Sequence, residues 1–260
     1  MNLGLTGKII IVTGGAKGIG KGIVEVLAKE GALPVIVGRS EADNNKTVHE
    51  IEQAGGKAFA VTAELSIPAE CEKAVAAVVS RFGKIEGLVN NAGVNDGVNL
   101  EHGNYEKFMQ SIHSNLVHYY LMAQFALPHL IQSKGAIVNI GSKTAETGQG
   151  STSAYAAANG GRNALTREWA VELLKYSIRV NAVIVAECFT PLYESWVSQF
   201  KNPQEKLSQI TKLIPLEKRM TTAHEIANAV VFLLSECSSH TTGQLIHVDG
   251  GYVHLDRALV

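Results

Sequence analysis

A glycine-rich segment near the N-terminus has the residue types and the spacing of a phosphate-binding loop. An apolar strand over residues 8–12 runs directly into Thr13-Gly14-Gly15-Ala16-Lys17-Gly18-Ile19-Gly20, and a helical stretch follows at once. Gly14 permits a tight turn, Gly18 lets the backbone approach a ligand, and Gly20 lets the helix pack closely on the strand. The helix N-terminus offers free N–H groups to a pyrophosphate. The alternative is an ordinary strand-to-helix turn, but the flanking strand and helix favour phosphate binding.

Further polar residues follow later strands. The small residues of Asn90-Asn91-Ala92-Gly93 would let a nucleotide lie close to the chain. Ser142 follows the next strand, and Tyr155 stands thirteen residues beyond it, four residues before Asn159 and so on the same helical face. Asn115 lies inside a long helical stretch, where it either breaks the helix locally or faces solvent. Because ligands of open α/β sheets sit beyond the carboxyl ends of strands, we expect these groups to gather there.

The elements that must position these residues alternate regularly between strand and helix. Most of the strands are rich in Val and Ile without polar alternation, as in parallel strands buried on both faces. They are expected over 9–13, 34–38, 57–62, 87–90, 136–140, 179–184 and 244–248. Helices are expected over 20–30, 43–54, 68–82, 105–133, 153–176 and 223–235. This order predicts one Rossmann-type α/β domain over residues 1–260, a doubly wound parallel sheet with helices on both faces. The irregular stretch 185–215 breaks the alternation and is expected to form a substrate lid.

These motifs, in this order and spacing, resemble those of the short-chain dehydrogenase/reductase family over essentially the whole chain. The resemblance implies an NAD(P)-dependent oxidoreductase. In it, Tyr155 is the general acid/base, Ser142 orients the substrate oxygen, and Asn115 maintains a water-linked proton relay. A phenol can serve as the partner for the hydroxyl proton when a carbinol is oxidised. The cofactor contacts carried over are Gly14, Lys17, Gly18, Ile19, Gly20, Asn91, Ala92 and Gly93.

A closer resemblance is to the L-fucose dehydrogenases within that family. It is carried by the segments 89–97, 142–145, 147–150, 165–171, 190–193, 248–252 and 254–260. Such enzymes oxidise the anomeric hydroxyl of a 6-deoxy sugar to a lactone. The polar residues expected to contact a sugar are Asn95, Gln149, Glu187 and Tyr193, whereas Trp196 suits packing within the lid.

Two positions depart from the family pattern: Val185-Ala186 replaces a usual Pro-Gly, with a modest effect expected on the nicotinamide pocket, and Asn159 replaces a lysine. The family's active tyrosine is followed four residues later by a lysine, which promotes ionisation of the tyrosine and holds the nicotinamide ribose, whereas this chain has Asn159. An amide can hydrogen-bond a ribose but carries no charge. A cation about 4–6 Å away shifts an acid by ~1–3 pKa units, so its loss predicts activity lower by roughly ten- to a thousandfold near neutral pH. Lys143 and Arg162 are the cations that could compensate. The rival hypothesis is a nucleotide-binding protein with weak or no catalysis.

The choice of nucleotide depends on the end of the second strand. NAD-binding proteins carry an acidic residue there for the ribose 2′-hydroxyl, but this chain has Gly38 followed by Arg39. Lys17 adds a second cation in the glycine loop. Both suit a 2′-phosphate, so we expect NADP to be preferred, with NAD possible. The alternative is that both are solvated surface charges. Glu64 is expected to meet the adenine edge.

Composition excludes several classes of protein. The 260 residues carry a net charge of −1, without the basic surplus of nucleic-acid binders, and no apolar run reaches the ~20 residues needed to cross a bilayer. No secretory signal is visible, which predicts a cytoplasmic protein. Three dispersed cysteines and nine histidines form no metal-ligand pattern, so no metal is expected. The expected partner is a small molecule, a sugar or another alcohol or carbonyl compound. The family resemblance implies a homodimer or homotetramer built on the helices 105–133 and 153–176, with the tail 254–260 against a neighbour.

Overall fold

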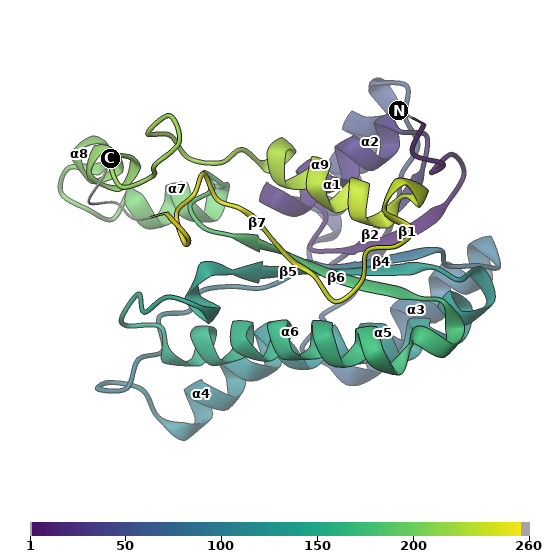
Figure 1. The fold of residues 1–260 in the computed structure, drawn as a ribbon, viewed down its shortest axis with the longest axis horizontal. Coiled ribbons are helices and arrows are strands. Elements are labelled where there is room, and N and C mark those ends of the chain that lie inside the picture. Colours follow the sequence, from purple (N-terminus) through teal and green to yellow (C-terminus); the bar gives the residue numbers. More distant parts are fainter. Residues whose placement is uncertain (1, 256–260) are drawn as a thin grey trace.

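Seven strands form one parallel sheet in the order β3-β2-β1-β4-β5-β6-β7 (Figure 1). The structure, a computed structural model, describes residues 2–255. The strand order reverses between β1 and β4, which places a crevice at the carboxyl ends of these strands. The doubly wound sheet predicted from the sequence is confirmed. The strands are β1 Ile9–Thr13, β2 Leu33–Gly38, β3 Phe59–Thr62, β4 Gly87–Asn90, β5 Ala136–Ser142, β6 Arg179–Val185 and β7 Leu245–Val248.

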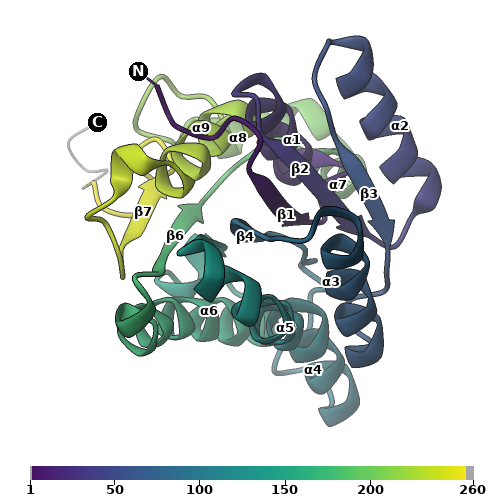
Figure 2. The same cartoon turned by 90° about the vertical axis from the view of Figure 1, so that its right-hand side faces the viewer.

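Helices cover both faces of the sheet (Figures 1 and 2). α1, α2 and α9 lie on one face, and α3, α5 and α6 lie on the other. The helices are α1 Gly18–Lys29, α2 Glu41–Gln53, α3 Pro68–Phe82, α4 Tyr105–Ile112, α5 His118–Ser133, α6 Ser153–Glu172, α7 Pro191–Val197, α8 Pro203–Thr211 and α9 Ala223–Leu234. Short helical turns are η2 Lys143–Ala145, η3 Leu174–Tyr176 and η4 Glu236–Ser238. A capping box of Thr222 and Glu225 begins α9, as its sequence predicts.

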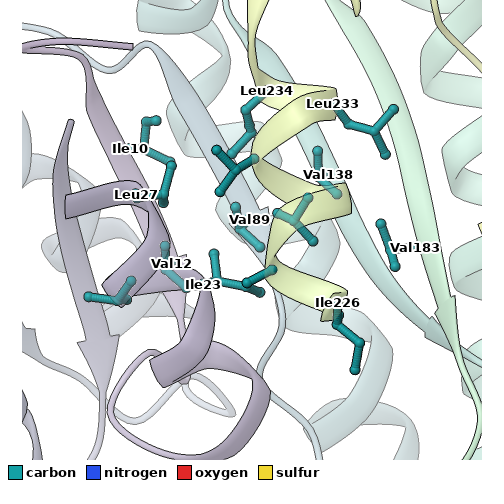
Figure 3. Packing of buried hydrophobic residues seen from close by; sticks show 14 of the residues in the cluster. Ile10, Val12, Ile23, Leu27, Val89, Val138, Val183, Ile226, Leu233 and Leu234 are labelled. Atoms are coloured by element: carbon teal, nitrogen blue, oxygen red, sulfur yellow. The ribbon is translucent and has the colours of Figure 1, made fainter. Parts of the chain in front are cut away.

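The strand β1 shows why the buried strands lack polar alternation. All five of its residues are buried. Successive side chains point to opposite faces, so Ile10 and Val12 join the core under α1 and α9, while Ile9 and Ile11 join the core under α3 and α5. Figure 3 shows the first of these cores, where side chains of α1 and α9 meet those of the central strands. Both faces of β1 are therefore apolar.

The predicted helix 105–133 is interrupted at Asn115. Its first part is α4, its last part is α5, and a π-helical segment, η1 His113–Val117, joins them. Asn115 is fully buried, so of the two alternatives the local break is correct and solvent exposure is wrong. π-Helical turns inside α-helices often mark functional sites, because the wider turn changes which backbone groups are available.

The predicted lid contains two short helices, α7 and α8, beyond the carboxyl ends of β5 and β6 (Figure 1). Phe189, Tyr193, Trp196 and Phe200 form a row of aromatic rings, with consecutive centroids 6.2, 5.2 and 5.0 Å apart. Trp196 therefore packs within the lid, as expected. Within residues 2–255, no helix combines the length and the apolar character needed to cross a membrane. The predicted subunit contact of the tail falls largely on residues 256–260, outside the described part of the chain.

Candidate active site

One cavity, of about 590 Å³, lies at the carboxyl ends of the central strands. All the residues predicted to hold the cofactor line it, and so do Ser142 and Tyr155. The cofactor set is Gly14, Lys17, Gly18, Ile19, Gly20, Arg39, Glu64, Asn91, Ala92 and Gly93. Segments that are far apart in the sequence thus line one cavity, as the parallel topology requires.

The glycine loop is fixed against the strand β4. Asn91 Nδ2 donates to the backbone oxygens of Thr13 (2.9 Å) and Gly14 (3.3 Å), and Thr13 Oγ1 accepts from the N–H groups of Asn91 and Ala92. Gly14 has φ +64°, which L side chains rarely adopt. A Cβ at Gly20 would overlap the oxygen of Gly14 and lie 2.6 Å from Asn91 Nδ2. The loop therefore needs glycine at these positions and leaves a backbone cradle at the start of α1, which fits a nucleotide pyrophosphate.

Ser142 and Tyr155 form another part of the cavity wall. Ser142 ends β5, and its Oγ accepts hydrogen bonds from the backbone N–H and the hydroxyl of Thr144, at 3.3 and 3.1 Å. Because both of these bonds use the oxygen as acceptor, the Ser142 proton remains for an acceptor in the cavity. Tyr155 lies in the first turn of α6 and lines the cavity, where a phenol is chemically able to transfer a proton.

Asn115 and Asn159 lie behind this wall, and both are fully buried. Asn115 Oδ1 accepts from the N–H of Val94 at 2.8 Å, which ties the π-helical segment to the chain after β4. Asn159 Nδ2 donates to the backbone oxygen of Tyr155 at 2.9 Å, and its Oδ1 accepts from Arg162 at 3.1 Å. Asn159 is absent from the cavity lining, so in this arrangement its side chain does not reach the place of a nicotinamide ribose.

Arg162 brings a positive charge to this wall. It is 3% exposed and lines the cavity. Its Nε donates to the backbone oxygen of Asn115 at 2.7 Å, and its Nη1 donates to the oxygen of Ile140 at 3.1 Å. Its Cζ lies 4.3 Å from the ring centroid of Tyr119 and 6.0 Å from that of Tyr155. Of the two cations that the sequence offers as compensation, Arg162 is the one that reaches the tyrosine.

Lys143, the other candidate, turns toward the lid. Its ammonium forms an ion pair with Glu187 and lies 4.1 Å from the ring centroid of Tyr252. The paired side chains are only 8% and 13% exposed. Burial, together with the adjacent carboxylate of Glu187, raises the pKa of Tyr193. Lys143, Glu187, Tyr193 and Tyr252 thus form a polar cluster next to Ser142, which we call the lid cluster.

The other two predicted sugar contacts lie apart from the lid cluster. Asn95 is exposed, and its Oδ1 lies 3.4 Å from the N–H of Gly97 in a surface turn. Gln149 is exposed and lines a second, open hollow formed by residues 144–153 with Ala156. The structure therefore brings Glu187 and Tyr193 together and leaves Asn95 and Gln149 outside that cluster.

At the far end of the cavity, both predicted phosphate-binding cations have acidic neighbours. Lys17 Nζ lies 2.6 Å from Asp43, whose pKa is lowered chiefly by this bond. The side chain of Arg39 is 83% exposed, and its Nη1 lies 3.9 Å from Glu64. The pKa of Glu64 is lowered chiefly by the backbone N–H of Ser66. Arg39 is therefore the more available of the two cations.

His118 is a wall residue that the sequence analysis missed. It is 1% exposed, and its Nε2 lies 3.1 Å from the backbone oxygen of Ser114. Burial, with a further contribution from the charge of Arg162, lowers the pKa of His118 to about 3, so the ring is neutral near pH 7. Its position three residues after Asn115, on the same helical side, is the signal that could have identified it.

Comparisons with known proteins agree with this geometry. A family model described as Enoyl-(Acyl carrier protein) reductase matches residues 14–253. L-fucose dehydrogenase of Rattus norvegicus is 32% identical over 247 residues, 95% of this chain and 89% of the rat protein. The 3-oxoacyl-(acyl-carrier-protein) reductase FabG of Thermotoga maritima is 34% identical, over 96% of this chain and 99% of that protein.

Solved structures show the same relationship. The crystal structure of Cj0485 dehydrogenase is 46% identical with a TM-score of 0.94, covering 99% of this chain and 98% of that one. Levodione reductase is 31% identical with a TM-score of 0.92, covering 97% and 100%. These relatives are dehydrogenases and reductases, and they give no support to the non-catalytic rival. From its sheet, its glycine loop and these relatives, the chain is an oxidoreductase that belongs to the short-chain dehydrogenase/reductase family.

Proposed function

We propose that this protein is an NAD(P)-dependent dehydrogenase that oxidises a sugar hydroxyl, most closely in the manner of an L-fucose dehydrogenase. The observation that carries the proposal is that Ser142 and Tyr155 line one cavity, while Lys143, the residue after Ser142, belongs to the lid cluster. L-fucose is proposed as the sugar because several mammalian relatives are named L-fucose dehydrogenase.

The wall residues can perform the proton half of this reaction. When bound, the nicotinamide accepts the hydrogen of the carbinol carbon together with its electron pair. Ser142 donates its free proton in a hydrogen bond to the substrate oxygen and fixes its position. Tyr155 takes the hydroxyl proton as the carbon–oxygen double bond forms. For the anomeric hydroxyl of a sugar, the product of this step is a lactone.

The lid cluster suits the remaining hydroxyls of a sugar. Glu187 accepts hydrogen bonds, Lys143 donates them, and the phenol of Tyr193 does both. The ring of Tyr193 also offers an apolar face to the carbon side of a sugar ring. Asn95 and Gln149 remain proposed contacts that need movement of their surface loops to reach the substrate.

We propose NADP as the preferred nucleotide, with NAD as a second cofactor. The support is the exposed Arg39 beside the cavity and the absence of a carboxylate at Gly38. Because Lys17 is paired with Asp43, Arg39 carries most of the preference. Charge-assisted bonds contribute about 1.5–3 kcal/mol, and exposure reduces this, so Arg39→Ala should weaken NADP binding by roughly tenfold. Binding of NAD, measured in the same fluorescence titration, should be unchanged; an equal loss for both nucleotides would contradict this assignment.

We also propose a cytoplasmic homodimer or homotetramer. Its support is the set of large apolar side chains exposed on or next to the helices expected at the interface, Tyr105, Phe108, Tyr120, Val171 and Leu174. The three cysteines, Cys71, Cys188 and Cys237, are free thiols. Light scattering after size-exclusion chromatography tests the oligomeric state, and a monomer at micromolar concentration would exclude it.

The function is tested by turnover with purified protein. Reduced nicotinamide should appear with L-fucose, or another aldose of a panel, and NADP between pH 7 and 10. Tyr155→Phe is the control, since it removes only the hydroxyl and should abolish turnover while nucleotide affinity stays within about twofold. Binding of NADPH without turnover on any sugar or alcohol would instead favour a nucleotide-binding protein.

A further inference from the structure

Arg162 is a buried cation without a carboxylate partner. Within the part of the chain that the structure describes, none of the ion pairs includes it. Its four bonded N–H groups go to neutral oxygens, those of Ile140, Asn159 and, twice, Asn115. A buried charge is strongly unfavourable unless it is paired. A protein that retains such a charge in a cavity wall is built to meet an anion there.

Two phenols lie near the guanidinium, those of Tyr119 and Tyr155, and of the two only Tyr155 lines the cavity. Tyr155, Asn159 and Arg162 lie on one face of α6, and the guanidinium carbon is 6.0 Å from the phenol ring centroid. Asn159 links the other two, because it donates to the backbone of Tyr155 and accepts from Arg162. Asn159, which stands in place of the family's lysine, therefore holds a different cation, Arg162, one turn further along α6.

Space for this cation is provided by Gly93. A Cβ at this position would lie 2.8 Å from Arg162 Nη2 and 2.9 Å from Asn115 Oδ1. The π-helical segment also fixes the guanidinium, since the backbone oxygen of Asn115 accepts a hydrogen bond from Arg162 Nε. Gly93 and the π-helical interruption at Asn115 thus both help to accommodate the Arg162 guanidinium.

The other titratable groups around the pair carry no unbalanced charge near neutral pH. From the π-helical segment and α5, His118 has a pKa of about 3 and is neutral. Burial raises the pKa of Tyr119 to about 12, so this phenol is neutral as well, and it donates to the oxygen of Ile140. From η2, Lys143 is balanced by Glu187. Of these groups, Arg162 is therefore the one that brings an unbalanced charge close to Tyr155.

We propose that Arg162 supplies the positive charge that stabilises the Tyr155 phenolate during proton transfer, with Asn159 holding the guanidinium in place. The inference rests on the proposed oxidation of a hydroxyl. The phenolate takes the hydroxyl proton while the carbinol hydrogen leaves with its electron pair to the nicotinamide, and the phenol then returns its proton to solvent. Arg162 acts through Tyr155, so it is a positioning residue.

The kinetic test compares Arg162→Met with Arg162→Lys from pH 6 to 10.5. A cation at this range shifts an acid by about 1–3 pH units, so Arg162→Met should lower kcat at pH 7 by roughly ten- to a thousandfold and recover toward pH 10. Arg162→Lys should retain most of kcat, and NADPH affinity should change by less than about twofold in both. A loss that is equal at every pH and equal in both variants would show a structural role and overturn the inference.

Two changes at Asn159 test the inference without removing the arginine. Asn159→Asp has nearly the same shape but would pair with Arg162 and cancel its charge, so it should lower kcat at pH 7 as Arg162→Met does. Asn159→Lys should restore much of the activity in the Arg162→Met background, because it returns a positive charge next to Tyr155. Wild-type activity in Asn159→Asp would overturn the inference even if Arg162→Met fails to fold.

A direct readout separates this inference from the proposed function. In protein labelled with 3-fluorotyrosine, the Tyr155 resonance is assigned by Tyr155→Phe and followed by ¹⁹F NMR against pH. Its ionisation should require a higher pH in Arg162→Met, and in Asn159→Asp, than in the wild type. If no sugar or alcohol is oxidised but this shift appears, the proposed function fails and the inference stands. An identical titration of wild type and both variants would overturn the inference.

Discussion

The buried ion pair of Lys143 and Glu187 gives a prediction whose size follows from the structure. Its side chains are 8% and 13% exposed, so removal of one partner leaves the other charge buried. Breaking a buried pair in this way costs about 3–5 kcal/mol. We expect Lys143→Met to lower the free energy of unfolding by about 3 kcal/mol. This value is at the lower end of that range because both side chains keep some contact with water. The measurement is urea unfolding at pH 7, followed by circular dichroism at one protein concentration.

A matched control is available in the same chain. Lys17 also pairs with an acid, Asp43, but these side chains are 61% and 32% exposed. Exposed pairs contribute about 0–1 kcal/mol, so Lys17→Met should change stability by less than 1 kcal/mol. The double variant Lys143→Met with Glu187→Leu should be less destabilised than the sum of its single changes. If Lys143→Met is as mild as Lys17→Met, the pair is solvated and the lid cluster does not exist as described.

Three further predictions concern the loop, the wall and the last helix. Gly20→Ala should abolish measurable NADPH binding, since the new Cβ would overlap the Gly14 oxygen. Gly160→Ala is the control, because no atom lies within 4 Å of its Cβ. It should leave NADPH binding intact and change the free energy of unfolding by at most about 1 kcal/mol. His118→Asn should make the free energy of unfolding depend less on pH between about 3 and 6.5. In the wild type, the native ring stays neutral down to about pH 3 while the unfolded ring gains a proton below pH 6.5, so stability falls by up to about 1.4 kcal/mol for each pH unit in this window. Urea unfolding of both proteins at pH 4 to 7 measures the difference. Glu225→Gln should cost about 1 kcal/mol at pH 7, and because the native carboxyl has a pKa of about 2, below its ordinary 4.5, this difference should disappear as pH falls from 4.5 to 2.

Much of the fold could be predicted because its signals are local. The Val- and Ile-rich strands and the helices between them require a parallel sheet, and the bounds of α3 agree with the predicted 68–82. The glycine loop was predictable because its spacing, its strand and its helix are contiguous. The break at Asn115 remained an open alternative, since a π-helical turn depends on groups from other elements, here the Arg162 side chain and the backbone N–H of Val94.

The site divides in the same way. The sequence by itself determined the nucleotide loop, the pairing of Ser142 with Tyr155, and the missing lysine at Asn159, because each is a matter of residue type and spacing along the chain. Only the tertiary structure decided which cation stands beside the tyrosine. Lys143 and Arg162 are equally charged in the sequence, but the packing of β5, η1 and α6 seats Arg162 against Tyr155 and turns Lys143 to Glu187. Electrostatic roles depend on distance and burial, and these are properties of the folded chain.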